Sequence, residues 1–284
     1  KNNNKGKGSY NGNRGADRRP QYRDRDNVRY NDAPSVDEEG LVVGRNAVRE
    51  LLRSGRDIDK LLVQKGEREG SIVVLVAEAI ERHIPVVETD RAKLDKLTGG
   101  ASHQGIVAMA AEKEYSSVED IFALAEERGE APFIILCDEL EDPHNLGAII
   151  RTAETAGAHG VIIPKRRNAS LTWAIGKASA GAVEYVPVAR VGNLASTIDD
   201  LKKRGLWVYT ADMDGQNWCE TDFSGPVALV VGSEGNGVSR LIKEKSDFVV
   251  SLPMRGKITS LNASVAAGIL MYEVSRQRLG LKAK

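Results

Sequence analysis

The sequence predicts an α/β protein whose larger part is built on a parallel sheet, and two observations support this prediction. Over residues 118–284, short apolar runs alternate with amphipathic helical segments. The runs are apolar at nearly every position, which is typical of strands that helices cover on both faces. A hydrophobic content of 41% over 284 residues is sufficient for two folded cores, so we expect two domains.

The first α/β pattern occupies residues 40–111 and predicts a small domain. Its first helix is expected over Ala47–Arg53, where Val48, Leu51 and Leu52 share one face. Further helices are expected over Ile72–Glu81 and Arg91–Leu97, and strands over Lys60–Gln64, Ile84–Glu88 and Gly105–Ala110. No catalytic constellation is evident here. His103 lies between turn-forming glycines and a strand, so we expect a turn residue or an RNA contact.

A polar segment without periodicity, residues 112–117, is expected to link the small domain to a larger one over residues 118–284. The expected strands of the larger domain are Phe133–Cys137, Val161–Ile163, Tyr185–Val188, Leu206–Tyr209, Val227–Val231 and Phe248–Leu252. A helix over Ala263–Arg278 is expected to close the chain. In parallel sheets ligands bind beyond the carboxyl ends of the strands, so the site is expected there.

The formal net charge is zero, but it is unevenly distributed. Residues 1–30 carry nine Lys and Arg against three Asp, a net charge of +6 (9 − 3), which leaves −6 for the remainder. With few aliphatic residues, the basic tail over residues 1–39 is expected to be disordered. It is either a solvated tail or an arm that binds RNA phosphates and stacks Tyr and Arg on bases. The composition leaves both readings open.

Several classes of protein are disfavoured. No apolar run approaches the roughly 20 residues that cross a bilayer, and no signal peptide opens the sequence. Two cysteines, Cys137 and Cys219, are too few for a disulfide framework or a zinc site. We therefore expect a cytoplasmic protein without a membrane partner and without a metal.

The first segment that carries chemistry extends from Asp138 to Arg151, off a strand, through a turn at Pro143 and into a helix. Asn145 is expected to be the N-cap of that helix. Arg151 follows six residues later, so Asn145 and Arg151 point in different directions around the helix. Arg151 then faces whatever packs beside the first turns, or pairs on the surface with Glu141 or Glu154. Spacing alone favours the surface ion pair.

The second segment is a fully apolar strand that ends in the glycine-rich loop Gly232-Ser233-Glu234-Gly235-Asn236-Gly237. Glycines allow a backbone to approach a ligand closely, which suggests a nucleotide or nucleoside site. The order is neither the dinucleotide fingerprint nor the phosphate loop. Because Glu234 would repel a pyrophosphate, an uncharged or cationic ligand such as S-adenosylmethionine suits the loop better. A glycine turn without a ligand is the alternative.

The third segment, residues 251–266, contains a strand end, a loop with Pro253 and Gly256, and a helix that Ser260 or Asn262 is expected to cap. The helix opens with small residues that permit close packing of another backbone. They are Ala263, Ala266, Ala267 and Gly268. Core packing alone is enough to explain them.

Together, and in this order, the three segments resemble the signature motifs of the SpoU/TrmH family of RNA 2′-O-ribose methyltransferases, part of the SPOUT superfamily. Residues 44–52 and 103–108 are similar to the small N-terminal domain of its ribosomal-RNA branch. The resemblance covers residues 40–280 and is nearest to enzymes that methylate a guanosine in the peptidyl-transferase region of 23S rRNA.

The resemblance implies a SPOUT-type parallel sheet with a C-terminal trefoil knot, at which S-adenosylmethionine binds. It also implies a ribosomal-protein-like RNA-binding domain before that sheet. Family members are homodimers whose active sites are completed across the interface. The small-residue face of Ala263–Gly268 is expected to be packed inside that dimer.

The resemblance also assigns residues by motif position. The residues implied to bind the cofactor's adenosine are Gly232, Leu252, Met254 and Leu261, and Thr210 is implied to line the same pocket. The implied catalytic residues are Asn145, Arg151, Glu234 and Asn262. The implied RNA contacts are Arg45, His103 and Gln104. Because a guanidinium rarely gives up its proton, we favour Arg151 as the group that holds the target phosphate and stabilises developing charge. Solvent then takes the ribose proton.

Three alternatives remain open from the sequence. The same fold serves a tRNA 2′-O-methyltransferase or an adenosine-specific rRNA resistance methyltransferase. A non-catalytic RNA-binding or ribosome assembly protein is a second possibility. A nicotinamide-dependent enzyme is the third, and the glycine order disfavours it.

Overall fold

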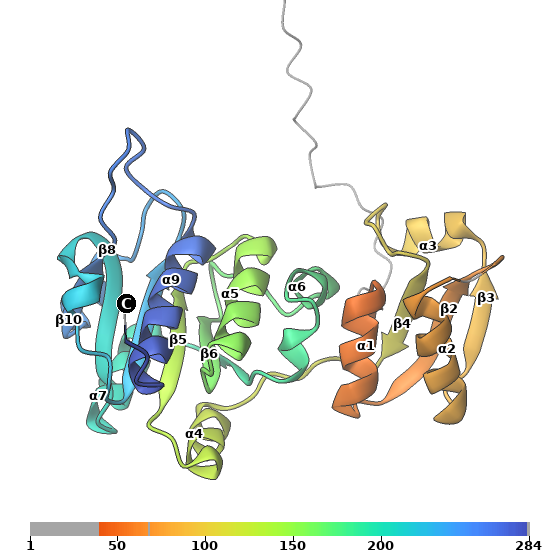
Figure 1. Cartoon of the computed structure of the whole chain (residues 1–284), viewed down its shortest axis with the longest axis horizontal. Coiled ribbons are helices and arrows are strands. Elements are labelled where there is room, and N and C mark those ends of the chain that lie inside the picture. Colours follow the sequence, from red (N-terminus) through yellow and green to blue (C-terminus); the bar gives the residue numbers. More distant parts are fainter. Residues whose placement is uncertain (1–39, 68, 283–284) are drawn as a thin grey trace, which may run out of the picture. The chain divides into compact units, whose positions relative to one another are not determined.

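The computed structural model describes residues 40–67 and 69–282 (Figure 1). Residues 40–110 form a four-stranded sheet with the order β1-β4-β2-β3, in which β2 and β3 are parallel and the other pairs antiparallel. Its elements are β1 Leu41–Val43, α1 Arg45–Ser54, β2 Ile58–Gln64, α2 Ser71–Glu81, β3 Val86–Thr89, α3 Arg91–Leu97 and β4 Ile106–Ala110. The three helices and three of these strands were predicted, whereas β1 is too short for a periodic signal.

The small domain's core explains why its helices form. α1 buries Ala47, Val48, Leu51 and Leu52, the face that helical periodicity predicted. α2 buries residues at the same three-and-four spacing, and these side chains meet β2 and β4 in one apolar cluster. The sheet and the two helices therefore share a continuous core.

The larger domain is a six-stranded sheet that is parallel throughout, as predicted, and its strand order is β10-β8-β9-β5-β6-β7. Its strands are β5 Phe133–Asp138, β6 Gly160–Pro164, β7 Val188–Val191, β8 Trp207–Asn217, β9 Val227–Gly232 and β10 Phe248–Ser251. Its helices are α4 Val118–Arg128, α5 Pro143–Thr155, α6 Trp173–Ala178, α7 Leu194–Lys203, α8 Arg240–Lys245 and α9 Ala263–Arg278. Every residue of β5 and β9 is buried, because one apolar cluster covers each face of the sheet.

Two expected strands differ from those observed. The strand expected over Tyr185–Val188 is wrong: a 3-10 helix, Ala182–Glu184, precedes it, and β7 begins only at Val188. Pro187 has no N–H to give to a ladder, which fits its place before the strand. The strand expected over Leu206–Tyr209 instead continues to Asn217. Its second half is polar, and it pairs with β10 after a register shift between Val249 and Val250.

The sheet order creates a switch point between β5 and β9. From β5 the chain proceeds to β6 and β7 on one side, and then β8, β9 and β10 fill the other. In open α/β sheets the crevice outside the carboxyl ends at such a point is the usual ligand site. This is where the three segments that carry chemistry end.

Helix α9 returns from the sheet edge at β10 and packs against α5 and β9 (Figure 1). A Cβ at Gly268 would lie 3.7 Å from Thr152 Cγ2 on α5, an ordinary van der Waals distance, so an alanine would also fit between the two helices. Ala263 and Ala267 are buried in the chain's own core. Two of the small residues, Ala263 and Ala267, therefore pack within the chain, and the dimer interface expected for this face stays a prediction.

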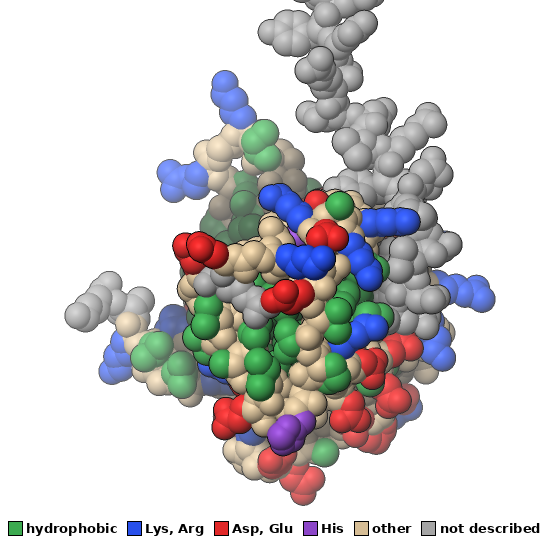
Figure 2. Space-filling model, turned by 90° about the vertical axis from the view of Figure 1, so that its right-hand side faces the viewer, with side chains coloured by type: hydrophobic (Ala, Val, Ile, Leu, Met, Phe, Trp, Pro, Cys, Tyr) green, Lys and Arg blue, Asp and Glu red, His purple; other side chains and the backbone are tan. Residues whose placement is uncertain are grey.

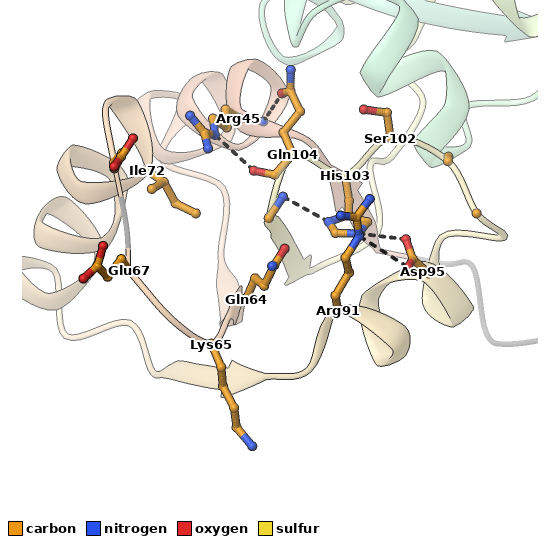
Figure 3. A pocket seen from close by; sticks show the side chains of 14 residues that line it. Arg45, Gln64, Lys65, Glu67, Ile72, Arg91, Asp95, Ser102, His103 and Gln104 are labelled. Carbon is orange, nitrogen blue, oxygen red and sulfur yellow. Dashed lines mark hydrogen bonds and ion pairs between the residues drawn. The ribbon is translucent and has the colours of Figure 1, made fainter.

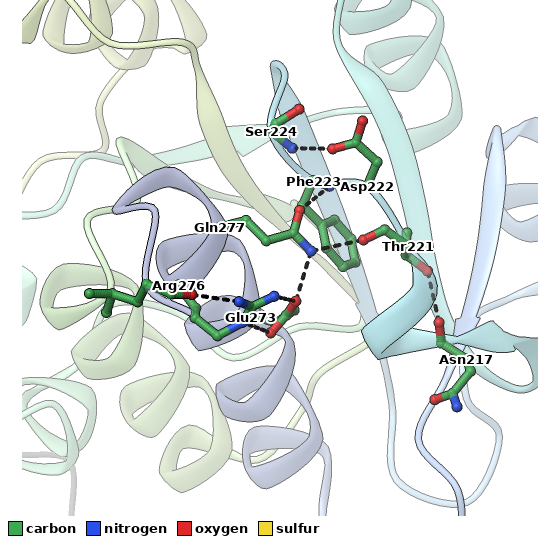
Figure 4. Close-up of polar contacts among 9 residues, drawn as sticks. Asn217, Thr221, Asp222, Phe223, Ser224, Glu273, Arg276 and Gln277 are labelled. Carbon is green, nitrogen blue, oxygen red and sulfur yellow. Dashed lines mark hydrogen bonds and ion pairs between the residues drawn. The ribbon is translucent and has the colours of Figure 1, made fainter. Parts of the chain in front are cut away.

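The second half of α9 is tied to the connection between β8 and β9 (Figure 4). Gln277 accepts from Phe223 N at 2.7 Å and donates to Thr221 O at 2.8 Å and to Glu273 Oε1 at 2.7 Å. Glu273 also pairs with Arg276. Because Glu273 is buried, these partners are needed to satisfy its carboxylate.

Among the residues described, no helix is long and apolar enough to cross a membrane. The predictions about the basic tail concern residues 1–39, which lie outside the described part of the chain.

Candidate active site at the carboxyl edge of the sheet

Three loops bring polar side chains together at the switch point. Asn145 Nδ2 donates to Glu234 Oε1 at 3.0 Å, and Asn262 Nδ2 donates to Asn145 Oδ1 at 3.0 Å. Asn262 Nδ2 also contacts Glu234 Oε1. We call these three residues the amide–carboxylate triad. It joins the start of α5, the loop after β9 and the start of α9, so three predicted catalytic positions lie together.

Each member of the triad is held by its own element. Asn262 caps α9, as predicted, since its Oδ1 accepts from Ser264 N at 3.0 Å and from Val265 N at 3.3 Å. The prediction that Asn145 caps α5 is wrong, because Asp142 does so by accepting from His144 N at 2.9 Å. Asn145 lies one turn further in and is 4% exposed. Its amide is therefore free to bridge the other two loops.

The glycine-rich loop after β9 leaves no room for a side chain at its first position. Ser233 and Gly237 exchange backbone hydrogen bonds, which bring the two ends of the loop together. As a result, a Cβ on Gly232 would lie 2.0 Å from the carbonyl carbon of Gly237. Asp138, at the end of β5, accepts from Ser239 N at 2.7 Å and fixes the far end of the loop. Asp138 and Asp142 are supporting residues that the sequence analysis missed. Asp142 directly precedes the helix start at Pro143, which is a capping signal, whereas Asp138 ends a strand and its partner Ser239 lies 101 residues away.

The loop over residues 253–261 fits an adenosine. Within the described chain its backbone N–H and C=O groups make no hydrogen bonds, so they remain available to a ligand. Met254 and Leu261 are 37% and 41% exposed, and Leu252 is half-buried. Apolar side chains beside free backbone groups are what an adenine ring needs. Glu234 at the same edge suits a cationic centre.

Thr210 is placed differently. It is fully buried in β8, and its hydroxyl contacts Ser246 Oγ at the end of α8. The side chain is thus engaged on the α8 side of the sheet. A cofactor-lining role for Thr210 stays a prediction that would have to involve its backbone.

Arg151 lies on α5 beyond Asn145, with its side chain exposed. Within the described residues it pairs with neither Glu141 nor Glu154, the two carboxylates with which a surface ion pair was expected. The predicted divergence from Asn145 is confirmed, because one side chain is buried in the triad and the other is exposed. Arg151 is therefore available to an external anion.

The expected RNA-contact residues lie together in the small domain. Arg45 Nε donates to Gln104 O at 3.0 Å, and the Arg45 backbone N–H donates to Gln104 Oε1 at 3.0 Å. His103 is buried, with Nε2 at 3.0 Å from Asp95 Oδ1 and Nδ1 accepting from Gly105 N at 3.0 Å. Both ring nitrogens are occupied, which favours a turn-forming role for His103; an RNA contact by its ring stays a prediction.

Two further chemistries find little support in the site. Among the described residues, no group of three His, Cys, Asp or Glu side chains could hold a metal ion. Burial raises the pKa of the Cys137 thiol to about 12, so this cysteine is no nucleophile at neutral pH.

Comparisons with known proteins agree with this geometry. Residues 132–272 match the model of the SpoU rRNA Methylase family, and residues 41–116 match the model of RNA 2′-O ribose methyltransferase substrate binding. YacO of Bacillus subtilis (strain 168), named as a TrmH family tRNA/rRNA methyltransferase, is 50% identical over 238 residues, which are 84% of this chain and 95% of YacO. A TrmH family relative from Staphylococcus aureus (strain MSSA476) is 46% identical over 245 residues, 85% of this chain and 97% of its own.

Solved structures show the same architecture. The SpoU methyltransferase AviRb from Streptomyces viridochromogenes, in complex with AdoMet, superposes with a TM-score of 0.72 at 24% identity, over 86% of this chain and 92% of AviRb. An RNA 2′-O ribose methyltransferase gives a TM-score of 0.70 at 27% identity, over 84% of this chain and 88% of the other. Fold, site and matching models together define an enzyme that methylates RNA. The chain belongs to the SpoU/TrmH family of RNA methyltransferases.

Proposed function

We propose that this protein transfers a methyl group from S-adenosylmethionine to the ribose 2′-hydroxyl of a guanosine in the peptidyl-transferase region of 23S rRNA. The observation that carries the proposal is the amide–carboxylate triad at the switch point, together with an exposed Arg151 on the same helix as Asn145 that pairs with no described residue. The substrate-binding match over residues 41–116 supports an RNA substrate. A ribosomal one is favoured by the family's name and by a neighbour from Sinorhizobium meliloti that is an AdoMet-bound rRNA methyltransferase.

Gly232, Leu252, Met254 and Leu261 are the residues that would hold the cofactor's adenosine. When bound, S-adenosylmethionine supplies an electrophilic methyl group on a sulfonium. The free backbone groups of residues 253–261 and the exposed apolar side chains beside them fit its neutral part. We infer that residues 233–262 follow the family's trefoil knot, which the return of the chain from β10 to α5 and β9 supports.

The chain's own residues have separable roles. Arg151 binds the phosphate beside the target ribose and stabilises the charge that develops on the attacking oxygen. Glu234 and Asn262 act as positioning residues, because Glu234 Oε1 and the Asn262 amide are used within the triad. Asn145 holds the start of α5, and with it Arg151, in register with the cofactor loops. Water takes the ribose proton.

The proposal includes a homodimer formed through the exposed face of α9. Val265, Ile269 and Tyr272 are 50%, 36% and 52% exposed, and their spacing of four and three residues places them on one side of the helix. Helix α9 packs against α5, which carries the exposed Arg151, so an isologous contact through this apolar face would bring a second chain to the site. Light scattering on the full chain should report two chains, and Ile269→Glu should give one inactive chain. An active monomer would contradict a shared site.

The test of the function is methyl transfer from labelled S-adenosylmethionine to deproteinised 23S rRNA and, in parallel, to bulk tRNA. A 2′-O-methyl group blocks alkaline cleavage of the adjacent phosphodiester, so the product is recognised by its resistant dinucleotide. We expect one labelled guanosine in 23S rRNA. Label in tRNA alone would favour the second candidate, a tRNA 2′-O-methyltransferase. This candidate is supported by the name of YacO, which includes both tRNA and rRNA.

A further inference from the structure

The small domain contains a hollow of about 520 Å³, formed by the start of α1, the segment from β2 to α2, and residues 91–105 (Figure 3). This volume lies within the range of sites that bind a nucleotide-sized ligand. Ile72 lies beneath the hollow and is 4% exposed, and a Cβ on Gly105 would lie 3.5 Å from Ile72 Cδ1. The side chains that remain accessible in the hollow are therefore mainly polar and charged.

Two polar groups face the hollow without partners. The Gln64 side chain points inward beside Ile72 in Figure 3, and among the described residues its amide makes no hydrogen bond. Arg45 uses Nε to bond Gln104 O at 3.0 Å, which leaves its two terminal nitrogens free within the same part of the chain. The Gln64 amide and the two terminal nitrogens of Arg45 therefore line the hollow without a hydrogen-bond partner among the described residues.

The wall formed by residues 103–105 is held in place by hydrogen bonds before any ligand arrives. His103 bonds Asp95 through Nε2 and accepts from Gly105 N through Nδ1, each at 3.0 Å. Gln104 and Gly105 have φ values of 53° and 81°, a left-handed pair that this histidine and Arg45 hold in place. A site that is formed in advance loses less entropy on binding.

The charges of the hollow exclude a simple anion site. Among the described residues, three cations, Arg45, Lys65 and Arg91, line it together with three carboxylates, Glu67, Glu69 and Asp95. Figure 2, which looks onto the small domain, shows blue and red side chains close together on this face. A ligand with a single negative charge and a neutral part rich in donors and acceptors matches this mixture. A nucleotide within RNA has that composition.

We propose that the hollow binds one unpaired nucleotide of the RNA substrate, with the edge of its base on the Gln64 amide and its phosphate on Arg45. Sequence-specific RNA recognition targets unstacked bases that a protein can contact on a face and an edge. This proposal rests on the proposed function, since it names the RNA feature that the small domain recognises. The hollow then selects RNA by a displaced base, separately from the nucleotide that is methylated.

The test uses the full chain and two RNA probes, a stem with a single-stranded loop and the same stem as a blunt duplex. Wild type should prefer the looped RNA. Gln64→Leu, which removes the amide at similar volume, and Ser102→Trp, which fills the hollow from its exposed rim, should each reduce that preference about tenfold. Arg45→Ala should do the same, whereas Arg53→Ala, the loss of an equal charge on the same helix outside the hollow, should leave the preference unchanged.

Site mapping completes the experiment. With 4-thiouridine in the loop, photo-crosslinks should fall on peptides containing Gln64 or residues 100–105 in wild type and disappear in Ser102→Trp. Equal losses in Arg45→Ala and Arg53→Ala would overturn the proposal, because they would indicate charge alone. Crosslinks confined to other peptides would overturn it as well.

The two proposals can fail separately. Crosslinks in the hollow without methyl transfer to 23S rRNA or tRNA would support the hollow and contradict the enzyme. Methyl transfer at wild-type rate and specificity by Gln64→Leu and Ser102→Trp, with loop preference intact, would support the enzyme and contradict the hollow.

Discussion

The amide–carboxylate triad and the hollow of the small domain are both clusters of polar side chains, but their hydrogen-bonding states are opposite. In the triad, Asn145, Glu234 and Asn262 bond one another and the start of α9. In the hollow, Gln64 and the terminal nitrogens of Arg45 have no partner in the described chain. A closed cluster fixes the loops that carry it, whereas an open one retains its binding capacity for a ligand. Motif resemblance found all three members of the closed cluster, but of the two open groups in the hollow it found only Arg45.

The largest expected effect concerns Arg151, the free cation next to the closed cluster. Arg151→Ala should lower methyl transfer by about 10²-fold or more, because a contact to developing charge is lost. Cofactor affinity, measured by calorimetry, should stay near wild type. Arg240→Ala removes an exposed charge of the same domain and should leave turnover unchanged. Near-normal turnover in Arg151→Ala would contradict a catalytic role for this residue.

The second prediction separates the two roles of Asn262. Asn262→Ala should lower the free energy of unfolding by about 1 kcal/mol through loss of the N-cap, and should also impair methyl transfer. Asn262→Ser keeps a capping hydroxyl but cannot bridge Asn145 and Glu234. We expect it to retain stability in urea unfolding and still lose activity. If Asn262→Ser is fully active, the triad is only a helix cap.

The third prediction tests whether charge outside the folded domains contributes to RNA affinity. Residues 1–30 carry a net +6, so their removal should weaken RNA binding most at low salt and flatten the slope of log K against log salt. The methylated position should stay the same, because base selection belongs to the folded domains. An unchanged slope would leave the tail without an electrostatic role, and a moved methylation site would mean that it reads sequence.

The smallest effect concerns His159, a buried side chain whose two ring nitrogens both have hydrogen-bond partners. Burial lowers the pKa of His159, whose Nδ1 accepts from Phe133 N at 3.0 Å and whose Nε2 lies 3.0 Å from Glu130. The folded state keeps the ring neutral, while the unfolded chain takes up a proton near pH ~6.5. Stability should therefore fall as pH drops below that value, and His159→Gln should flatten this part of the profile. An equally steep profile in His159→Gln would assign the loss to other groups.

Periodicity predicted much of the fold because buried helices and parallel strands have continuous apolar signals. It failed where a polar strand continues, as in β8 to Asn217, and where Pro187 follows a 3-10 helix. The site was accessible through motif resemblance, but spacing could not show that Asn145 meets Glu234 and Asn262, 89 and 117 residues away. Asp142 took the capping position expected for Asn145 because both residue types cap helices equally well. Gln64 gave no signal at all, since an unpartnered amide is a property of three-dimensional surroundings.

The sheet order has a consequence for how the protein is made. β9, the strand between β5 and β8, emerges from the ribosome after more than three quarters of the chain, and Asn262 follows it. Until then β5, β6 and β7 have an open edge, and β8 has no neighbour to which it can pair. A nascent or truncated chain therefore cannot bind the cofactor or modify the RNA around it. Synthesis itself delays activity until the last strand and helix have been inserted.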